Sequence, residues 1–308
     1  MKNINFSCPE CYSELREGNN SLKCSKCKEK YAIESGIPIF IPSRLENFKE
    51  KEMRFHDKHS EKYDEAHNLE SKKIQFIHED FLKYLSSLPK KALVLEAGCG
   101  TGKDLVEIRE KGFRAVGFDI SRKMVEETGK KLKEKKFNDV KVFVGDAERI
   151  PFENELFDSV VMVATLHHLK NNEKGIREMS RVLKKGGTMI IGSEPNSWPY
   201  YFKKVKHSRV GRKIVSFFRK DYNVEEVSIG DETTEGFKEK ELRKLFERNG
   251  LKVVKYNYVL FLSGFLLLLK INLPKAIEKA LLSFDALLLK IPLVKRIGWH
   301  VNIVLRKE

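Results

Sequence analysis

The sequence predicts an α/β fold, in which a mostly parallel sheet has helices on both faces and follows a small metal-binding module. Two observations carry this prediction. Between Lys91 and about Ser193, apolar runs of strand length alternate with amphipathic stretches of helix length, the order of elements that builds such a sheet. Four of the five cysteines lie in two close pairs near the start of the chain. We therefore divide the chain into residues 1–43, 44–90 and 91–308.

Size and composition indicate a folded chain with excess positive charge. The 308 residues are 41% hydrophobic, enough for a large core and too apolar for a disordered chain. The formal net charge of +15 favours anionic partners such as RNA or an acidic membrane surface, and a lysine-rich solvated surface explains it equally well. The start of the chain lacks a signal-peptide core, and the longest apolar run, residues 259–269, is shorter than the ~18 residues of a bilayer span. We expect a cytoplasmic protein.

The first part, residues 1–43, carries two cysteine pairs, Cys8-x2-Cys11 and Cys24-x2-Cys27. In an intracellular chain this spacing indicates a metal site rather than disulfides. Two such pairs can close a tetrahedral site around Zn²⁺. Because four thiolates leave no open position, we expect the zinc to be structural and to supply folding energy to a module too small to build much core.

Residues 44–90 are expected to form a helical bridge. The segment is rich in charge, and its apolar side chains recur at spacings that suit one face of a helix. These side chains are Phe76, Ile77, Phe81, Tyr84 and Leu85. We expect this face to cover the neighbouring domain.

Residues 91–308 contain the elements of the sheet. The expected strands are residues 92–96, 115–119, 140–144, 159–163, 188–192, 251–259 and 300–305. Helices are expected after Gly102, after Ser121 as N-cap, after Ala147, from Asn172 to the Gly186-Gly187 pair, and over residues 238–249. Asp119 and Asp146 then fall at strand C-termini, where open parallel sheets bind their ligands.

A glycine-rich turn, Glu96-Ala97-Gly98-Cys99-Gly100-Thr101-Gly102, follows the first strand of this sheet. Small residues there let the backbone come close to a ligand. The spacing G-x-G-x-G lacks the third glycine of the dinucleotide pattern, and no Gly-Lys-Ser/Thr follows to hold a triphosphate. Asp119 lies about twenty residues further on, where a carboxylate can accept hydrogen bonds from both ribose hydroxyls. The turn therefore predicts a ligand that contains ribose and that is not held through a pyrophosphate group.

A ligand that carries adenosine and a charged amino-acid tail fits this turn better than NAD, and the surrounding motifs resemble a known family. The segments LVLEAGCGTG, AVGFDIS, GDAERIPFENELFDSVVMVATLHHL and MSRVLKKGGTMIIGSEPN are similar to class I S-adenosylmethionine-dependent methyltransferases of the quinone-methyltransferase-like type, type 11. The match covers roughly residues 90 to 200 in the correct order. It implies a Rossmann-like sheet of seven strands whose last strand inserts antiparallel.

The resemblance also implies roles for the matching residues. Gly98 and Gly100 would let the backbone approach the methionine moiety of S-adenosylmethionine, and Glu96 would orient that end. Asp119 would accept hydrogen bonds from the ribose hydroxyls, and Ile120 would pack on the adenine.

In the same pattern, Asp146 would accept a hydrogen bond from the adenine amine beside Ala147, and Ala164 would line the cofactor wall. The plainer alternative is that Asp119 and Asp146 cap the helices that follow them. For Ile120 and Ala147 the alternative is ordinary packing.

The sulfonium of S-adenosylmethionine already makes the methyl group electrophilic. The protein therefore chiefly has to position the acceptor atom and exclude water. An oxygen or nitrogen acceptor must still lose a proton. His167 and Glu194 are the predicted bases, while we favour a packing role for the neighbouring His168.

The metal-binding module has a resemblance of its own. Its end, Tyr31-Ala-Ile-Glu-Ser-Gly-Ile-Pro-Ile-Phe, resembles the zinc-ribbon ending of the Trm112-like family, whose members are small partners of methyltransferases. Here the ribbon would be fused to its client. Zinc ribbons also occur in a family that methylates ribosomal RNA, but in that family the second metal pair includes a histidine, which Cys24-x2-Cys27 does not reproduce.

Two segments bear on the acceptor. The basic stretch 203–220, with interleaved aromatic rings, suits RNA, and a solvated helix with a buried aromatic face explains it equally well. The leucine-rich insertion 259–297 is a cap on the active site, a peripheral membrane contact, or a pair of core or dimer helices. We expect a small-molecule or lipid-like acceptor first, RNA second, and a catalytically silent scaffold that binds a protein partner third.

Overall fold

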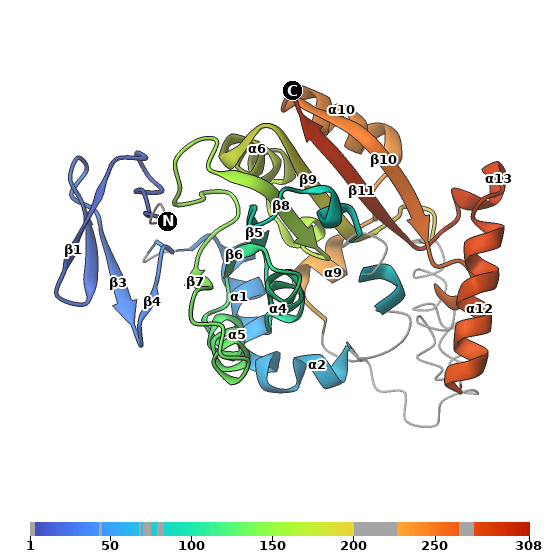
Figure 1. Ribbon diagram of the computed structural model, residues 1–308, viewed down its shortest axis with the longest axis horizontal. Coiled ribbons are helices and arrows are strands. Elements are labelled where there is room, and N and C mark those ends of the chain that lie inside the picture. The colour runs from blue at the N-terminus through green and yellow to red at the C-terminus, as the bar shows by residue number, and fades with distance from the viewer. Residues whose placement is uncertain are drawn as a thin grey trace.

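The computed structural model describes residues 4–42, 45–67, 69, 75–78, 83–199, 227–264 and 274–308. Within them, a four-stranded antiparallel sheet of order β1-β2-β3-β4 lies at one end of the molecule, and a seven-stranded sheet forms its centre (Figure 1).

The large sheet confirms the predicted fold class. Its order is β10-β11-β9-β8-β5-β6-β7, in which β5 to β9 run parallel and β11 lies antiparallel between β9 and β10. The strands are β5 (Leu93–Ala97), β6 (Arg114–Asp119), β7 (Lys141–Val144), β8 (Phe157–Val163), β9 (Leu183–Pro195), β10 (Leu251–Val259) and β11 (His300–Lys307). From β5 the chain proceeds outward on one side to β6 and on the other to β8. Such a reversal of strand order leaves a crevice at the carboxyl ends of the strands.

The helices that pack on this sheet are α4 (Lys103–Glu110), α5 (Arg122–Glu134), α6 (Asn172–Val182) and α10 (Glu239–Arg248). Ser121 is the N-cap of α5, as predicted, because its side chain accepts a hydrogen bond from the Met124 backbone nitrogen. Asn171 caps α6 in the same way. Two short helices, η3 (Leu166–His168) and α9 (Ile229–Thr233), lie in contact with each other.

Two sequence predictions in this region are wrong. No helix lies between Ala147 and β8. The chain makes tight turns there, in which the Arg149 backbone nitrogen donates to the Asp146 carbonyl, and Pro151 has no N–H to donate within a helix. The helix that begins at Asn172 ends at Val182 rather than at the glycine pair, because the next residue already pairs with β8 as the first of β9.

The N-terminal sheet consists of β1 (Leu15–Gly18), β2 (Ser21–Cys24), β3 (Lys30–Glu34) and β4 (Ile37–Pro38). It packs beside β7: the Phe40 backbone nitrogen donates to the Val144 carbonyl at 2.8 Å, and the Phe40 ring lies 5.7 Å from that of Phe143. Buried residues of both sheets form one hydrophobic cluster. The predicted boundary at residue 43 lies outside the described residues.

The described part of residues 44–90 is largely helical, with α1 (Asn47–His59), η1 (Ser60–Lys62), α2 (Tyr63–Ala66) and η2 (Lys83–Ser87). Ile77 and Leu85 are buried, as expected of the covering face, while Phe81 lies outside the described residues. Helix α1 contacts α5 and α9.

The C-terminal insertion contributes α12 (Lys275–Leu288) and α13 (Pro292–Lys295). Among the residues that the structure describes, no helix has both the length and the apolar character needed to cross a bilayer. The basic stretch 203–220 and residues 265–269 lie outside that part of the chain.

Candidate functional site

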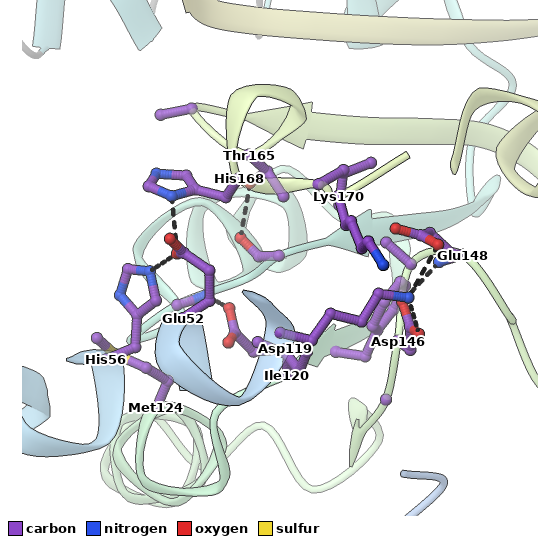
Figure 2. Close-up of a pocket in the computed structure, with 18 of the residues that line it drawn as sticks. Glu52, His56, Asp119, Ile120, Met124, Asp146, Glu148, Thr165, His168 and Lys170 are labelled. Carbon is purple, nitrogen blue, oxygen red and sulfur yellow. Dashed lines mark hydrogen bonds and ion pairs between the residues drawn. The ribbon is translucent and has the colours of Figure 1, made fainter. Parts of the chain in front are cut away.

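A pocket opens at the carboxyl ends of β5, β6, β7 and β8 (Figure 2). Its empty volume, counting the open space at the mouth, is about 770 Å³. All but Glu96 of the predicted cofactor-binding residues line it, namely Gly98, Gly100, Asp119, Ile120, Asp146, Ala147 and Ala164.

The glycine turn after β5 has a backbone that favours glycine. Gly98 has φ +72°, and a Cβ there would lie 2.4 Å from the Thr165 side chain. Gly100 has φ +51°, and a Cβ there would meet no atom within 4 Å. The turn therefore presents open backbone to the pocket, as the close approach of a ligand requires.

Asp119 ends β6 beside this turn. Its two carboxylate oxygens accept hydrogen bonds from the Gly100 and Ser121 backbone nitrogens, each at 2.9 Å. Burial raises its pKa, against the opposing effect of the nearby His56. Each carboxylate oxygen has two lone pairs, so both can accept a further hydrogen bond from a ligand hydroxyl.

Asp146 follows β7 and is paired with a lysine from α1. The Lys49 Nζ lies 2.7 Å from Asp146 Oδ2 and 2.8 Å from Glu148 Oε2, and all three side chains are buried. The Asp146 carboxylate predicted to meet an adenine amine therefore also holds α1 on the pocket.

Glu96 lies in β5 and does not line the pocket. It is 2% exposed, and among the described residues its Oε2 has no hydrogen-bond partner. Burial and the neighbouring Asp104 and Asp119 carboxylates raise its pKa well above the usual range. A neutral carboxyl group behind the turn is consistent with these surroundings.

A histidine and glutamate cluster forms another part of the pocket wall. Glu52 Oε2 lies 2.9 Å from His168 Nδ1 and 3.3 Å from His56 Nε2 (Figure 2). Glu52 Oε1 accepts a hydrogen bond from the Gly230 nitrogen of α9. Burial acts to raise the pKa of Glu52, but the hydrogen bonds from His168 and His56 lower this pKa to about 2. Since a carboxylate only accepts, Nδ1 of His168 is the protonated ring nitrogen.

The two predicted bases, His167 and Glu194, pair with each other and do not line the pocket. His167 Nδ1 lies 2.8 Å from Glu194 Oε2, and the Glu194 carboxylate also accepts from the backbone nitrogens of Thr165 and Leu166. Burial opposes the charge on His167, but Glu194 and Asp231 raise its pKa to about 9. A histidine that is charged at neutral pH cannot accept a proton.

Sequence reasoning missed the residues that α1 and α2 bring to the site: Lys49, Glu52, His56 and Tyr63 all line the pocket. No family motif covers this segment. The four-residue spacing of Glu52 and His56, which places both on one helix face, was the available signal.

The four N-terminal cysteines form a second candidate site. Their sulfur atoms all lie within 4.8 Å of one another, with Cys8 and Cys27 at 3.6 Å and Cys11 and Cys24 at 3.4 Å. Sulfur atoms about 2.3 Å from a common zinc ion would be separated by similar distances. The donor set and its geometry fit a structural Zn²⁺ site.

Comparison with known proteins shows the family to which this chain belongs. A family model described as a methyltransferase domain matches residues 95–191. Demethylmenaquinone methyltransferase of Listeria welshimeri is 30% identical over 220 residues, which cover 68% of this chain and 92% of that protein. The chain belongs to the class I S-adenosylmethionine-dependent methyltransferases.

This methyltransferase is also similar to a second relative over a shorter stretch, and to a solved structure at low sequence identity. The tRNA (carboxymethyluridine(34)-5-O)-methyltransferase of Arabidopsis thaliana is 36% identical over 111 residues, which span 35% of this methyltransferase and a quarter (25%) of the relative. The solved geranyl diphosphate C-methyltransferase of Streptomyces coelicolor shares the fold, with a TM-score of 0.57 at 16% identity over 87% of this chain and 100% of the other. The methyl donor of this methyltransferase is S-adenosylmethionine.

Proposed function

We propose that this methyltransferase transfers a methyl group to a small-molecule or lipid-like acceptor. The proposal depends above all on the pocket at the carboxyl edge of the sheet, where an open glycine turn and two aspartates meet a histidine and glutamate cluster. S-adenosylmethionine supplies the electrophilic methyl group when bound. The residues of the chain bind and orient both substrates and accept a proton.

On the cofactor side, Asp119 accepts hydrogen bonds from the ribose hydroxyls, and Gly98 and Gly100 allow the methionine end to approach the backbone. Asp146 accepts a hydrogen bond from the adenine amine, and Ile120 packs on the adenine. Ala147 and Ala164 line the walls of the pocket. All of these line the pocket, which supports the assignment. Glu96, which the sequence predicts to orient the methionine end, does not line the pocket and is left out of this assignment.

On the acceptor side we assign the base to His168. Its Nδ1 donates to Glu52, so its Nε2 is the nitrogen able to take the proton that an acceptor oxygen or nitrogen loses as the methyl group arrives. Burial and the charge on His167 lower the His168 pKa, so the ring is neutral at pH 7. His167 and Glu194 instead position the segment that carries His168.

The acceptor class is supported by relatives. Two relatives that cover 67% and 68% of this chain are named for demethylmenaquinone, a quinone with a lipid-like tail. The relative named for tRNA keeps RNA as the second candidate, although the likeness spans only a quarter (25%) of that protein. The open pocket argues against a silent scaffold.

For the N-terminal module we propose a Trm112-like zinc ribbon, residues 1–43, that acts on its own methyltransferase domain. Its packing beside β7 and the hydrophobic cluster shared by both sheets support this arrangement. The Zn²⁺ held by Cys8, Cys11, Cys24 and Cys27 would stabilise the ribbon and take no part in methyl transfer.

Transfer of a labelled methyl group tests the acceptor class. Purified protein is incubated with S-adenosylmethionine labelled in the methyl group and with lipid, RNA and protein fractions. We expect label in the lipid or small-molecule fraction. Label confined to RNA would establish the second candidate, and cofactor binding without transfer to any fraction would favour the scaffold.

A further inference from the structure

The inner face of helix α12 is fixed to the end of β10. The Asp285 carboxylate accepts hydrogen bonds from the backbone nitrogens of Phe261, Leu262 and Ser263, at 2.9, 2.9 and 3.0 Å. Leu282, one turn earlier on the same face, is 3% exposed and belongs to a buried cluster with Trp299. The orientation of the helix is therefore set by its inner face.

The outer face of α12 is apolar and exposed. Ile277, Phe284 and Leu287 are 54%, 49% and 59% exposed, and Ile291, just beyond the helix, is 47% exposed. Their spacing of seven, three and four residues places them on one side of a helix. Large apolar side chains aligned in this way on a surface mark a site that binds another surface.

The exposed charges around this face are all positive in the described part of residues 274–297. Lys279, Lys290, Lys295 and Arg296 are exposed. The acidic residues of the same segment, Glu278 and Asp285, are 8% and 1% exposed and belong to the inner side of α12. An apolar strip beside lysines is complementary to an anionic lipid surface, where the strip enters the acyl boundary and the lysines meet the head groups.

We propose that the outer face of α12, defined by Ile277, Phe284, Leu287 and Ile291, docks on the surface of an anionic lipid bilayer. Figure 1 shows α12 at the opposite end of the molecule from the N-terminal sheet, so that sheet leaves the face free. The helix lies in the plane of the membrane. This inference deepens the proposed function, because a lipid-like acceptor would be collected at such a surface, but the docking itself does not require catalysis.

Flotation with vesicles tests the docking. The full chain is mixed with vesicles of phosphatidylcholine alone or with phosphatidylglycerol added, at low and high salt. We expect flotation with the anionic vesicles at low salt, and a large loss of flotation with phosphatidylcholine alone or at high salt. Wild-type protein that does not float with anionic vesicles would overturn the proposal.

Matched variants locate the contact. Phe284→Ser with Leu287→Ser should lower the bound fraction at least tenfold, and Lys279→Glu with Lys290→Glu should abolish the preference for anionic lipid. Val254→Ser is the control, since Val254 is 64% exposed but lies on β10. If the apolar double variant floats like wild type, or if it only converts a dimer to a monomer without changing flotation, the assignment to lipid is wrong.

S-adenosylmethionine binding is measured in every variant, and we expect it unchanged. Loss of flotation with intact cofactor binding supports docking independently of the acceptor. Absence of cofactor binding in the wild type would defeat the proposed function while leaving the flotation result to decide the docking.

Discussion

The adjacent histidines His167 and His168 differ in charge because their partners differ. His167 lies between Glu194 and Asp231, which raise its pKa to about 9 against the effect of burial. Burial and the neighbouring charged His167 lower the pKa of His168, which shares Glu52 with His56. The His167 ring is therefore charged at neutral pH, and the His168 ring is the neutral one to which we assign the base.

Replacing His168 by Ala should lower kcat by roughly 10²–10⁴-fold while leaving the affinity for S-adenosylmethionine unchanged. Because the neutral ring accepts the proton and its pKa is lowered, wild-type kcat should be flat at and above neutral pH and fall only in acid. Glu52→Gln should reduce kcat and change this profile. Full kcat in His168→Ala, measured by labelled-methyl transfer, would remove the histidine from catalysis.

Replacing His167 by Gln should change the pH dependence of stability. A pKa raised from 6.5 to about 9 in the folded protein stabilises it fully below pH 6.5, and this contribution is lost as pH rises toward 9. Thermal melts at pH 6 and pH 9 should therefore differ more for wild type than for His167→Gln. Equal differences in the two proteins would show that His167 does not carry the charge.

Single residues were predictable from the sequence where a local motif fixes them. Gly98, Gly100 and Asp119 belong to one strand-turn-helix-strand unit, so their approach to one pocket follows from chain order. Lys49 and Glu52 were not predictable, because they reach the pocket only through the packing of a helix about fifty residues before the turn in the sequence. The spacing of Glu52 and His56 places both on one helix face, but nothing in their own neighbourhood specifies where that helix packs.

At the scale of elements, α1 is attached to the pocket through one buried lysine. Lys49 is 7% exposed and bridges two carboxylates that would otherwise be buried with uncompensated charge. Removing one partner of a buried ion pair destabilises a protein more than replacing the whole pair by apolar residues, because it leaves a buried charge without compensation.

Lys49→Met should therefore lower the free energy of unfolding by about 3–5 kcal/mol. The control is Lys51→Met, an exposed lysine of the same helix, which should have little effect. Chemical denaturation measures both. Equal stability of the two variants would mean that Lys49 does not hold α1 in place.

The elements themselves followed from local signals where those were strong. Ser121 and Asn171 are N-caps whose side chains accept from the backbone three residues on, and the helices after them were predicted. The prediction failed after Ala147, where Glu178 from α6 accepts from the Ile150 nitrogen and Arg181 donates to the Ile150 carbonyl. These tertiary partners hold a turn that propensity alone does not specify.

At the scale of the whole molecule, the N-terminal sheet and the large sheet share one core. Phe6 stacks on Phe152 at 5.2 Å, and the Tyr12 hydroxyl donates to Glu178 of α6 at 3.0 Å. The stability of the ribbon should therefore be coupled to that of the methyltransferase domain.

Elemental analysis should find one zinc ion per chain, and a chelator or Cys24→Ser should remove it. Because the core is shared, we expect a lower Tm for the whole protein, followed in the chelated sample by recovery when zinc is returned. A protein purified without zinc, or a chelated protein with unchanged Tm, would contradict the structural role of the four cysteines.

Titration of the protein with S-adenosylmethionine by calorimetry tests the central claim most directly. Wild type should bind one equivalent, and Asp119→Ala should bind roughly 10- to 100-fold more weakly, since it loses hydrogen bonds to a charged group. Asp139→Ala, which removes a surface aspartate paired with Arg109, should bind like wild type. Wild-type protein that binds no S-adenosylmethionine, or Asp119→Ala that binds it as well as wild type does, would contradict the account.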